Sequence, residues 1–393
     1  MRKLIISMAL MLSVLFCCDA QDFSSILSNV ERNNATLKAL RSKAEADKLD
    51  ARTGLTPDDP EVEIGYLWET KDSQGSNRFD LGVSQTFDFP TVYYWRKKIS
   101  DGQCTVAEIE YAIGRKQILA QARQQCVELV YGNAICEILL ECMDNSKKVF
   151  EGMERRYRSG DIGVVALNEA RLSLMSATRA YERAEMERRS TLDALTLLNG
   201  GVKVNIECSD FAPVLVPASF ESWFASASAT NSEIELSSKG VEIAESSIKL
   251  AQSEWLPKFS IGYTSESIAG SSLQGISGGL SIPLWSGKGR VKAARARRQA
   301  SADMLEAERT RYMSEMKARY DKLVSLSEMC EEHRALLADS DAADLLIRSL
   351  HDGEINFEQY SMSMQLWYSS RMELLESYRD CHLLLAELED FAR

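Results

Sequence analysis

Proline occurs in only three short zones of this sequence, and this distribution favours a chain made of a few long helices. None of the seven prolines lies within residues 91–212 or 284–393; they are Pro57, Pro60, Pro90, Pro213, Pro217, Pro257 and Pro283. An interior proline removes a helical hydrogen bond and clashes with the preceding turn. Both proline-free spans are rich in Ala, Glu, Arg, Leu, Gln, Met and Lys, which favour helix. Each span can therefore be unbroken helix.

Both spans carry an apolar stripe that is interrupted by a glycine-marked turn. Apolar or small residues recur at steps of three and four from Leu119 to Tyr157, with one gap of seven, and from Tyr312 to Cys330, which is the period of one helix face. The turns are Ser159–Gly163 and His351–Ile355, where helix C-caps are expected. We predict two helical hairpins, whose first arms, 91–158 and 288–350, would each be roughly 95–100 Å long.

Segments of alternating polarity precede both helical hairpins. In 61–69, Val62, Ile64, Tyr66 and Trp68 alternate with acidic residues and glycine, and 79–89 alternates in the same way. This period of two predicts a β-hairpin over 61–89 with a polar loop from Lys71 to Asn77. A second β-hairpin is predicted over 257–285, with strands at 259–263 and 276–284 joined through the Ser/Gly-rich stretch 265–275.

The two halves of the chain resemble each other at a constant offset. Residues 60–66 and 257–263 share the pattern P-x-x-x-I-G-Y, and Gly160-Asp161-Ile162 corresponds to Gly353-Glu354-Ile355. An internal repeat of this size indicates a duplicated unit. The predicted organisation is a signal peptide (1–20), a first repeat (21–199) with a helix, β-hairpin 61–89 and helical hairpin 91–199, a linker (200–218), and a second repeat (219–393) with a helix, β-hairpin 257–285 and helical hairpin 288–391.

The N-terminus has the order of a secretory signal peptide. Arg2-Lys3 precedes an apolar run and then Cys18-Asp19-Ala20, a small-residue cleavage site. Acylation of Cys17 or Cys18 as a lipoprotein is an open alternative. The net charge of −12 argues against a nucleic-acid partner. The later cysteines lack zinc spacing and are interpreted as small buried hydrophobes, although pairing of some of them stays open.

Strands with one apolar face and one acidic or glycine-rich face suit a membrane barrel with lipid outside and water inside. The alternative is a soluble sheet whose apolar face packs on a core. Aromatic residues beside the β-hairpins fit a belt at the membrane interface: Tyr93, Tyr94, Trp95, Trp255 and Trp285. Bacterial barrels begin at about eight strands, so several copies must share one. We predict an α+β membrane protein, an oligomeric transmembrane β-barrel with four strands per chain that continues as a long α-helical barrel.

These patterns resemble the TolC-like outer-membrane efflux family over essentially the whole mature chain. The resemblance rests on the P-x-x-x-I-G-Y strand openings, on Ser84-Gln85-x-Phe87, and on the turns 157–162 and 350–355. It implies a homotrimer with a twelve-stranded barrel in the bacterial outer membrane and a helical tunnel through the periplasm. A periplasmic adaptor and an inner-membrane pump are the implied partners. The short length is more similar to the heavy-metal efflux branch.

The resemblance also suggests two functional sites. The turns would be tips that dock the adaptor, through Arg158, Gly160, Asp161, Ile162, Gly353, Glu354 and Ile355; alternatively, both glycines only cap helices. Asp341 and Asp344, shortly before the second tip, would form an acidic constriction that Arg155 and Arg156 keep closed through ion pairs. Alternatively, the aspartates form only a solvated acidic face. Unchanged divalent block and cation preference in single-channel measurements after Asp341→Ala/Asp344→Ala would contradict the gate.

No catalytic or cofactor motif accompanies these features. His333, His351 and His382 do not stand near a nucleophile or a second metal ligand at a recognisable spacing, and the sequence contains no P-loop and no G-x-G-x-x-G. We therefore expect no enzyme, no cofactor and no metal. The predicted function is a passive conduit in a tripartite efflux or type I-like export system, from the periplasm or the inner-membrane pump to the exterior. The alternative is a periplasmic coiled-coil adaptor or scaffold protein of an export complex.

Overall fold

A computed structural model describes residues 23–68, 77–268, 270–285, 287–338 and 342–392. The predicted signal peptide, with Cys17 and Cys18, lies outside these residues. The chain divides into two compact units, and each unit contains segments from both halves of the sequence. The first unit comprises Met1–Lys38, Gly114–Thr230 and Met313–Arg393, and the second comprises Ala39–Ile113 and Asn231–Tyr312.

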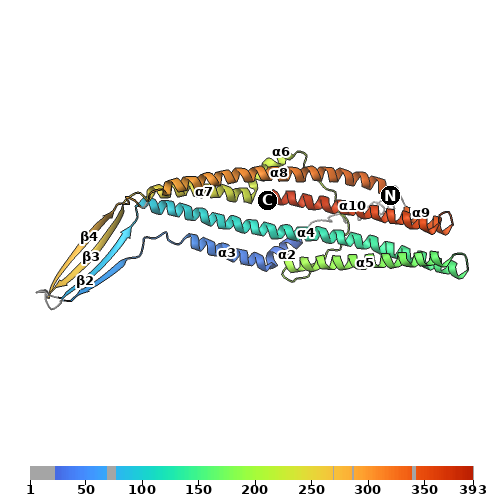
Figure 1. Cartoon of the computed structure of the whole chain (residues 1–393), viewed down its shortest axis with the longest axis horizontal. Coiled ribbons are helices and arrows are strands. Elements are labelled where there is room, and N and C mark those ends of the chain that lie inside the picture. The colour runs from blue at the N-terminus through green and yellow to red at the C-terminus, as the bar shows by residue number, and fades with distance from the viewer. Residues whose placement is uncertain (1–22, 69–76, 269, 286, 339–341, 393) are drawn as a thin grey trace, which may run out of the picture. The chain divides into compact units, whose positions relative to one another are not determined.

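A four-stranded antiparallel sheet belongs to the second unit (Figure 1). Its strands are β1 (Glu61–Leu67), β2 (Arg78–Phe87), β3 (Lys258–Ile268) and β4 (Ser271–Ser281), in the order β1-β2-β3-β4. Both predicted β-hairpins are present, and most of the predicted loop Lys71–Asn77 lies outside the described residues.

The prediction that 265–275 joins the second pair of strands was wrong, because most of this stretch is itself strand. β3 continues to Ile268 and β4 begins at Ser271, with cross-strand pairs such as Glu266↔Leu273. Serine and glycine suggested a loop. However, a strand is stabilised by the hydrogen bonds between its backbone and that of the neighbouring strands, and small residues fit where the side chains of those strands are crowded.

The two β-hairpins pair in equivalent registers. Glu61 is opposite Ser84 in the first, and Lys258 is opposite Ser281 in the second. Adding the sequence offset of 197 to Glu61 and Ser84 gives Lys258 and Ser281. The two hairpins therefore contain the same number of residues between these paired positions. The duplication itself remains an inference, to which this shared register adds support.

In the second unit, α4 follows the first β-hairpin and α7 precedes the second. The beginning of α4 (Pro90–Arg158) has its proline at the first helical position, where the missing N–H has no intrahelical partner to lose. α7 (Ser232–Ser253) starts after Asn231, whose side chain accepts hydrogen bonds from the N–H groups of Glu233 and Ile234. A Cβ at Gly102 of α4 would lie 2.8 Å from Cγ1 of Ile243, so the glycine lets α4 and α7 pack closely.

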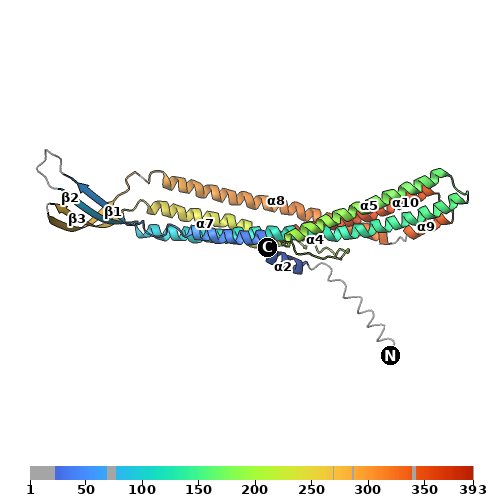
Figure 2. The ribbon, with the colours of Figure 1, turned by 90° about the horizontal axis from the view of Figure 1, so that it is seen from below.

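The first unit contains both helical hairpins' turns (Figures 1 and 2). Its helices are α2 (Ser24–Asn33), α5 (Val164–Leu198), α6 (Phe220–Thr230), α9 (Ala342–His351) and α10 (Phe357–Phe391), with the later parts of α4 and α8 (Arg290–Ala338); α3 (Ala35–Ala51) begins in this unit. The predicted arm 91–158 is confirmed by α4. The predicted arm 288–350 corresponds to α8 and α9, and residues 339–341 between them lie outside the description.

Aromatic rings fasten the start of α6 to the long helices of its unit. Phe220 lies 5.6 Å from the ring of Tyr320 in α8, and Phe224 stacks on Phe391 of α10 at 5.8 Å. Such ring pairs contribute more than their buried area alone. α6 is thereby held against both α8 and the C-terminal end of α10.

The segment between α5 and α6 is anchored by asparagine side chains. Asn133 of α4 donates hydrogen bonds to the carbonyl oxygens of Ile206 and Cys208, at 2.8 and 2.9 Å. Gly200 has a φ of +66°, and a Cβ there would lie 2.6 Å from the carbonyl oxygen of Asn33. Only glycine fits this turn, because both the backbone angle and the close approach of α2 exclude a side chain.

None of the described helices has an apolar stretch long enough to cross a membrane.

Candidate functional site: an apolar sheet face and two helical turns

One face of the sheet is apolar across all four strands. Cross-strand neighbours such as Val62↔Val83, Ile64↔Leu81 and Tyr263↔Ile276 share this face, because strand side chains alternate between the two sides. We call this set the apolar sheet face: Val62, Ile64, Tyr66, Phe79, Leu81, Val83, Phe87, Phe259, Ile261, Tyr263, Ile276 and Leu280.

The apolar sheet face is exposed in the single chain. Its exposed side chains range from 38% for Val83 and Phe87 to 84% for Ile276. In the described part of the chain, this face therefore does not pack on a core of its own chain. A contiguous apolar patch of this kind marks contact with lipid or with another protein surface.

The opposite face is polar and crowded. It carries Glu63, Asp80 and Glu266 together with several glycines. A Cβ at Gly262 would lie 2.7 Å from Oγ of Ser277, and one at Gly279 would collide with Oγ of Ser260. Small residues are needed here because side chains converge on this side, as they do on the inner wall of a curved sheet.

The sheet has two unpaired edges in the part that the structure describes. β1 pairs with β2 and β4 pairs with β3, each on one side only. All residues of β4 are exposed. Unpaired backbone N–H and C=O groups make such strands templates for another strand.

A buried carboxylate ties the base of the sheet to α4. Asp88, just after β2, accepts hydrogen bonds from Lys258 at 2.8 Å and from Arg96 at 2.9 Å, and its side chain is only 8% exposed. Its backbone N–H also donates to the hydroxyl of Tyr93 at 2.9 Å. Burial alone raises the pKa of the Asp88 carboxyl, but Lys258 and Arg96 outweigh burial and hold the pKa below its ordinary value. Alternation of polarity did not reveal this contact, because its partners are distant in sequence.

The predicted interfacial aromatics have different surroundings. Tyr93 supports Asp88 and lies under the guanidinium of Arg96, whereas Tyr94 contacts Trp95 edge to face at 5.0 Å. Trp255 packs over Gly287, where a Cβ would lie 2.7 Å from the indole, and Trp285 is 81% exposed. Their role as an aromatic belt remains a prediction.

Both helical turns end their preceding helix in the same way. Gly160 and Gly353 have φ angles of +83° and +79°. In the first turn, Asp161 N–H donates to the carbonyl of Arg156 at 2.9 Å, and in the second, Glu354 N–H donates to the carbonyl of Ser349 at 2.9 Å. The N–H groups of Gly160 and Gly353 also donate to the carbonyls of Tyr157 and Leu350, at 3.1 and 3.4 Å. Both turns are therefore Schellman motifs, so both glycines do cap helices.

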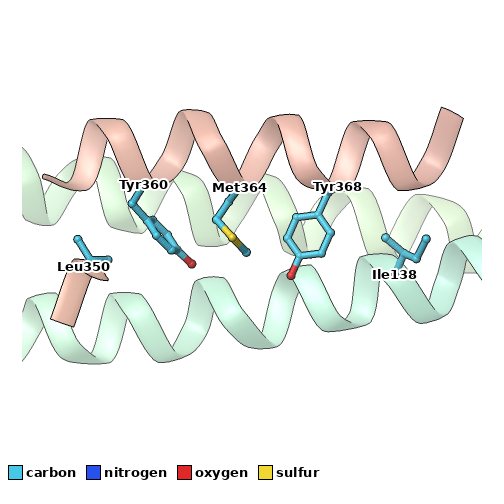
Figure 3. Packing of buried hydrophobic residues seen from close by; sticks show 5 residues of the cluster. All are labelled: Ile138, Leu350, Tyr360, Met364 and Tyr368. Carbon is cyan, nitrogen blue, oxygen red and sulfur yellow. The ribbon is translucent and has the colours of Figure 1, made fainter. Parts of the chain in front are cut away.

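The isoleucines of the turns face inward. Ile162 packs against a cluster centred on Met153, Leu167 and Ala170. Ile355 packs against a second cluster, in which Tyr360, Met364 and Tyr368 of α10 point toward α4, as Figure 3 shows with Leu350 and Ile138. Ile162 and Ile355 therefore hold the turns onto their helices.

The charged residues of the turns face solvent. Arg158 is exposed and pairs with Glu154 at 2.9 Å, and Asp161 accepts a hydrogen bond from Ser159 at 2.7 Å. Glu354 accepts from Ser349 at 2.9 Å. These hydrogen bonds and the ion pair fix the charged side chains at turns whose backbone is already ordered by the helix caps. The capping box between Asn356 and Gln359 at the start of α10 was missed, although its N-x-x-Q spacing is visible in the sequence.

The residues of the predicted gate are described in part. Arg155, Arg156 and Asp344 are exposed, and Asp341 lies outside the described residues. The gate remains a prediction.

His382 is hydrogen-bonded and packed within the protein. Its Nε2 lies 2.9 Å from the carbonyl oxygen of Ala212, its ring stacks on Phe211, and desolvation lowers its pKa. It lines a cavity of about 420 Å³ in which Arg123 pairs with Glu389 at 3.4 Å. The described residues include no group of three side chains suited to hold a metal ion.

Replacing the buried carboxylate should destabilise the sheet base in a pH-dependent way. Asp88→Asn leaves Lys258 and Arg96 without their anion, so we expect a loss of about 1–3 kcal/mol at pH 7. Because the folded-state pKa is lowered, the stabilisation by Asp88 is complete above its unfolded pKa of about 3.9 and is lost as the pH falls through the folded value. The melting temperatures of Asp88→Asn and the unmodified chain should therefore converge as the pH falls from 7 through the folded-state pKa of Asp88. Asp101→Asn, an exposed residue of α4, is the control; a gap for Asp88→Asn that does not narrow as the pH falls would contradict the expectation.

Comparisons with known proteins place this architecture among membrane channels. Neither a model of a protein family nor a curated protein sequence matches the chain. Among solved structures, CusC, studied for transmembrane channel formation, has a TM-score of 0.79 at 16% identity and covers 94% of this chain and 91% of its own. The CmeC outer-membrane channel of Campylobacter jejuni has a TM-score of 0.76 at 16% identity over 95% and 86%. The outer-membrane protein VceC of Vibrio cholerae has a TM-score of 0.75 at 13% identity over 94% and 96%. The chain therefore has the fold of the TolC-like outer-membrane efflux channels, as the sequence resemblance predicted.

Proposed function

We propose that the chain is the outer-membrane channel subunit of a tripartite efflux or type I-like export system in bacteria. It acts as a passive conduit from the periplasm or an inner-membrane pump to the exterior. The observation that carries the proposal is a sheet with one exposed apolar face, one crowded polar face and two unpaired edges. The shared fold with outer-membrane channels supports the same function.

The unpaired edges favour a barrel that several copies share. β4 of one copy would pair with β1 of the next, which satisfies the backbone groups that a bilayer leaves without water. Three copies, the number implied by the family resemblance, give twelve strands. This number lies within the range of bacterial barrels, whereas four strands do not.

In such a barrel, the two faces of the sheet would be in contact with lipid and with water, respectively. The apolar sheet face would contact lipid, and the face with Glu63, Asp80 and Glu266 would line the water-filled lumen. Glycines on the lumen side relieve crowding where the wall curves inward. Tyr94, Trp255 and Trp285 are exposed and would meet the membrane interface.

The helical turns would dock a periplasmic adaptor. Their glycines fix the backbone and their isoleucines pack inward, so the exposed groups for a partner are Arg158, Asp161 and Glu354. Capped turns of this kind lose little conformational entropy on binding, because they are already ordered.

A charge on the lipid side should block membrane assembly, whereas the same charge on the lumen side should not. Ile261 and Thr264 are exposed residues of β3 that point to opposite faces. Arginine at a lipid-facing site costs about 2–4 kcal/mol per copy near the bilayer centre. We expect Ile261→Arg to lower the amount of oligomer extracted from outer membranes at least tenfold, while Thr264→Arg stays near the unmodified level.

Fractionation and native mass spectrometry in detergent measure both variants. Equal amounts of assembled Ile261→Arg and Thr264→Arg would contradict the assignment of faces. Recovery of the unmodified chain as a soluble periplasmic protein would instead favour an adaptor or scaffold.

Reversing one charge at the first tip should impair export without affecting assembly. Arg158 is 74% exposed and pairs with Glu154 four residues earlier at 2.9 Å. Arg189 of α5 is 68% exposed and pairs with Glu185 in the same geometry, also at 2.9 Å. Because each exposed pair contributes only about 0.3–0.5 kcal/mol, neither Arg158→Glu nor Arg189→Glu should unfold the chain.

We expect Arg158→Glu to reduce export about tenfold and Arg189→Glu to leave it unchanged, with both present in the outer membrane at normal levels. Export is measured as resistance to, or secretion of, the cargo of the system that contains the gene. Full export by Arg158→Glu would remove this residue from the docking surface.

A further inference from the structure

Two cysteines from different helices meet inside the second helical hairpin. Cys330 of α8 and Cys381 of α10 bring their Sγ atoms to 3.9 Å, and the two residues are 3% and 1% exposed. We propose that Cys330 and Cys381 form a disulfide that joins α8 to α10 when the chain folds in an oxidising compartment. The proposal goes beyond the channel function and depends only on export of the chain.

Formation of this disulfide requires a small movement of the two cysteines. A disulfide has an S–S distance of about 2.05 Å, so the sulfurs must approach each other by roughly 1.9 Å. Both thiols already point into the same space between α8 and α10. Rotation of the side chains, with a slight shift of the helices, is the movement needed.

Other cysteines have different neighbours. Cys104 donates its S–H to the carbonyl of Lys48, and Cys208 donates to the carbonyl of Asp210 at 3.3 Å. Cys126 is completely buried, and burial raises the pKa of its thiol to about 12. We expect these three to stay reduced, which makes them internal controls.

The pair is shielded once the helices have packed. Burial raises the pKa of the Cys381 thiol to about 12 and also raises the pKa of Cys330. Thiolates are the reactive species in disulfide exchange. The bond must therefore form before α8 closes on α10, while the thiols are accessible, and it is then protected from reduction.

The oxidant is a disulfide of a thiol oxidoreductase. A thiolate of one cysteine attacks that disulfide, forming a mixed disulfide and releasing one oxidoreductase thiol. The thiolate of the second cysteine then attacks the mixed disulfide. Cys330 and Cys381 together lose two protons and two electrons, and the oxidoreductase ends as a dithiol.

The bond would close a loop that contains the second tip. The 51 residues of separation between the cysteines include α9, Gly353 and the Asn356 cap. A cross-link across a loop of this length restricts the unfolded chain strongly. It would also prevent α8 and α10 from sliding past each other in the helical hairpin that carries the second tip.

Peptide mapping of the unmodified chain tests the bond directly. The full-length chain is expressed with its own N-terminus, extracted in detergent, and denatured with N-ethylmaleimide to block free thiols. Trypsin without reductant cuts after Lys322, Arg334 and Arg379, which places each cysteine alone in its peptide, 323–334 and 380–393. We expect these two peptides as one linked species that separates on reduction. Both peptides carrying N-ethylmaleimide would overturn the proposal.

Thermal unfolding gives a second readout. Reductant, which reaches the bond once unfolding exposes it, should lower the apparent melting temperature of the unmodified chain and of Cys126→Ser by about 5 °C, and should not change that of Cys330→Ala. An equal effect of reductant on Cys330→Ala would show that another bond is responsible.

Discussion

Backbone hydrogen bonding at the edges of the sheet is the constraint on which the rest of this structure depends. A lone four-stranded sheet leaves β1 and β4 half paired, and it leaves an apolar face exposed on one side. Each unpaired N–H or C=O is costly where water is absent. In the proposed membrane setting, the chain would satisfy these groups only by adding strands, so the proposed barrel would require association. Crowding on the glycine-rich face would favour curvature in one direction, so that added strands could close into a barrel.

The helical hairpins are specified mostly by local chemistry. The absence of proline from 91–212 predicted a long helix, and α4 extends without interruption from Pro90 to Arg158. Glycine at position 160 predicted the end of that helix, because the cap needs a left-handed residue, and its φ of +83° agrees. Alternating polarity predicted β1 and β2 for a similar reason, since a period of two is a property of the strand itself.

Long-range contacts could not be predicted in this way. The carboxylate of Asp88 depends on Lys258, and the thiol of Cys330 meets Cys381; neither pair has a sequence spacing that a helix or strand period would reveal. The Ser/Gly-rich stretch 265–275 was misinterpreted because composition describes the local preference for loops, whereas pairing with β2 and β4 decides the outcome. At the tips, the sequence identified the glycines correctly but not that Ile162 and Ile355 pack inward.

The packing of α8 links these observations to assembly. Within one chain, α8 buries only Met316, Leu323 and Cys330, which are spaced seven residues apart. A stripe with one buried residue in each heptad is narrower than the face that a helix normally presents to a core. On the same helix, Met329 and Leu336 are more than half exposed and, seven residues apart, share a face that differs from the buried seam. α8 is thus anchored along one seam to its own chain and keeps a second apolar surface uncovered, which a neighbouring copy in a helical barrel would cover. A covalent bond at Cys330 would hold the narrow seam in register until that neighbour arrives.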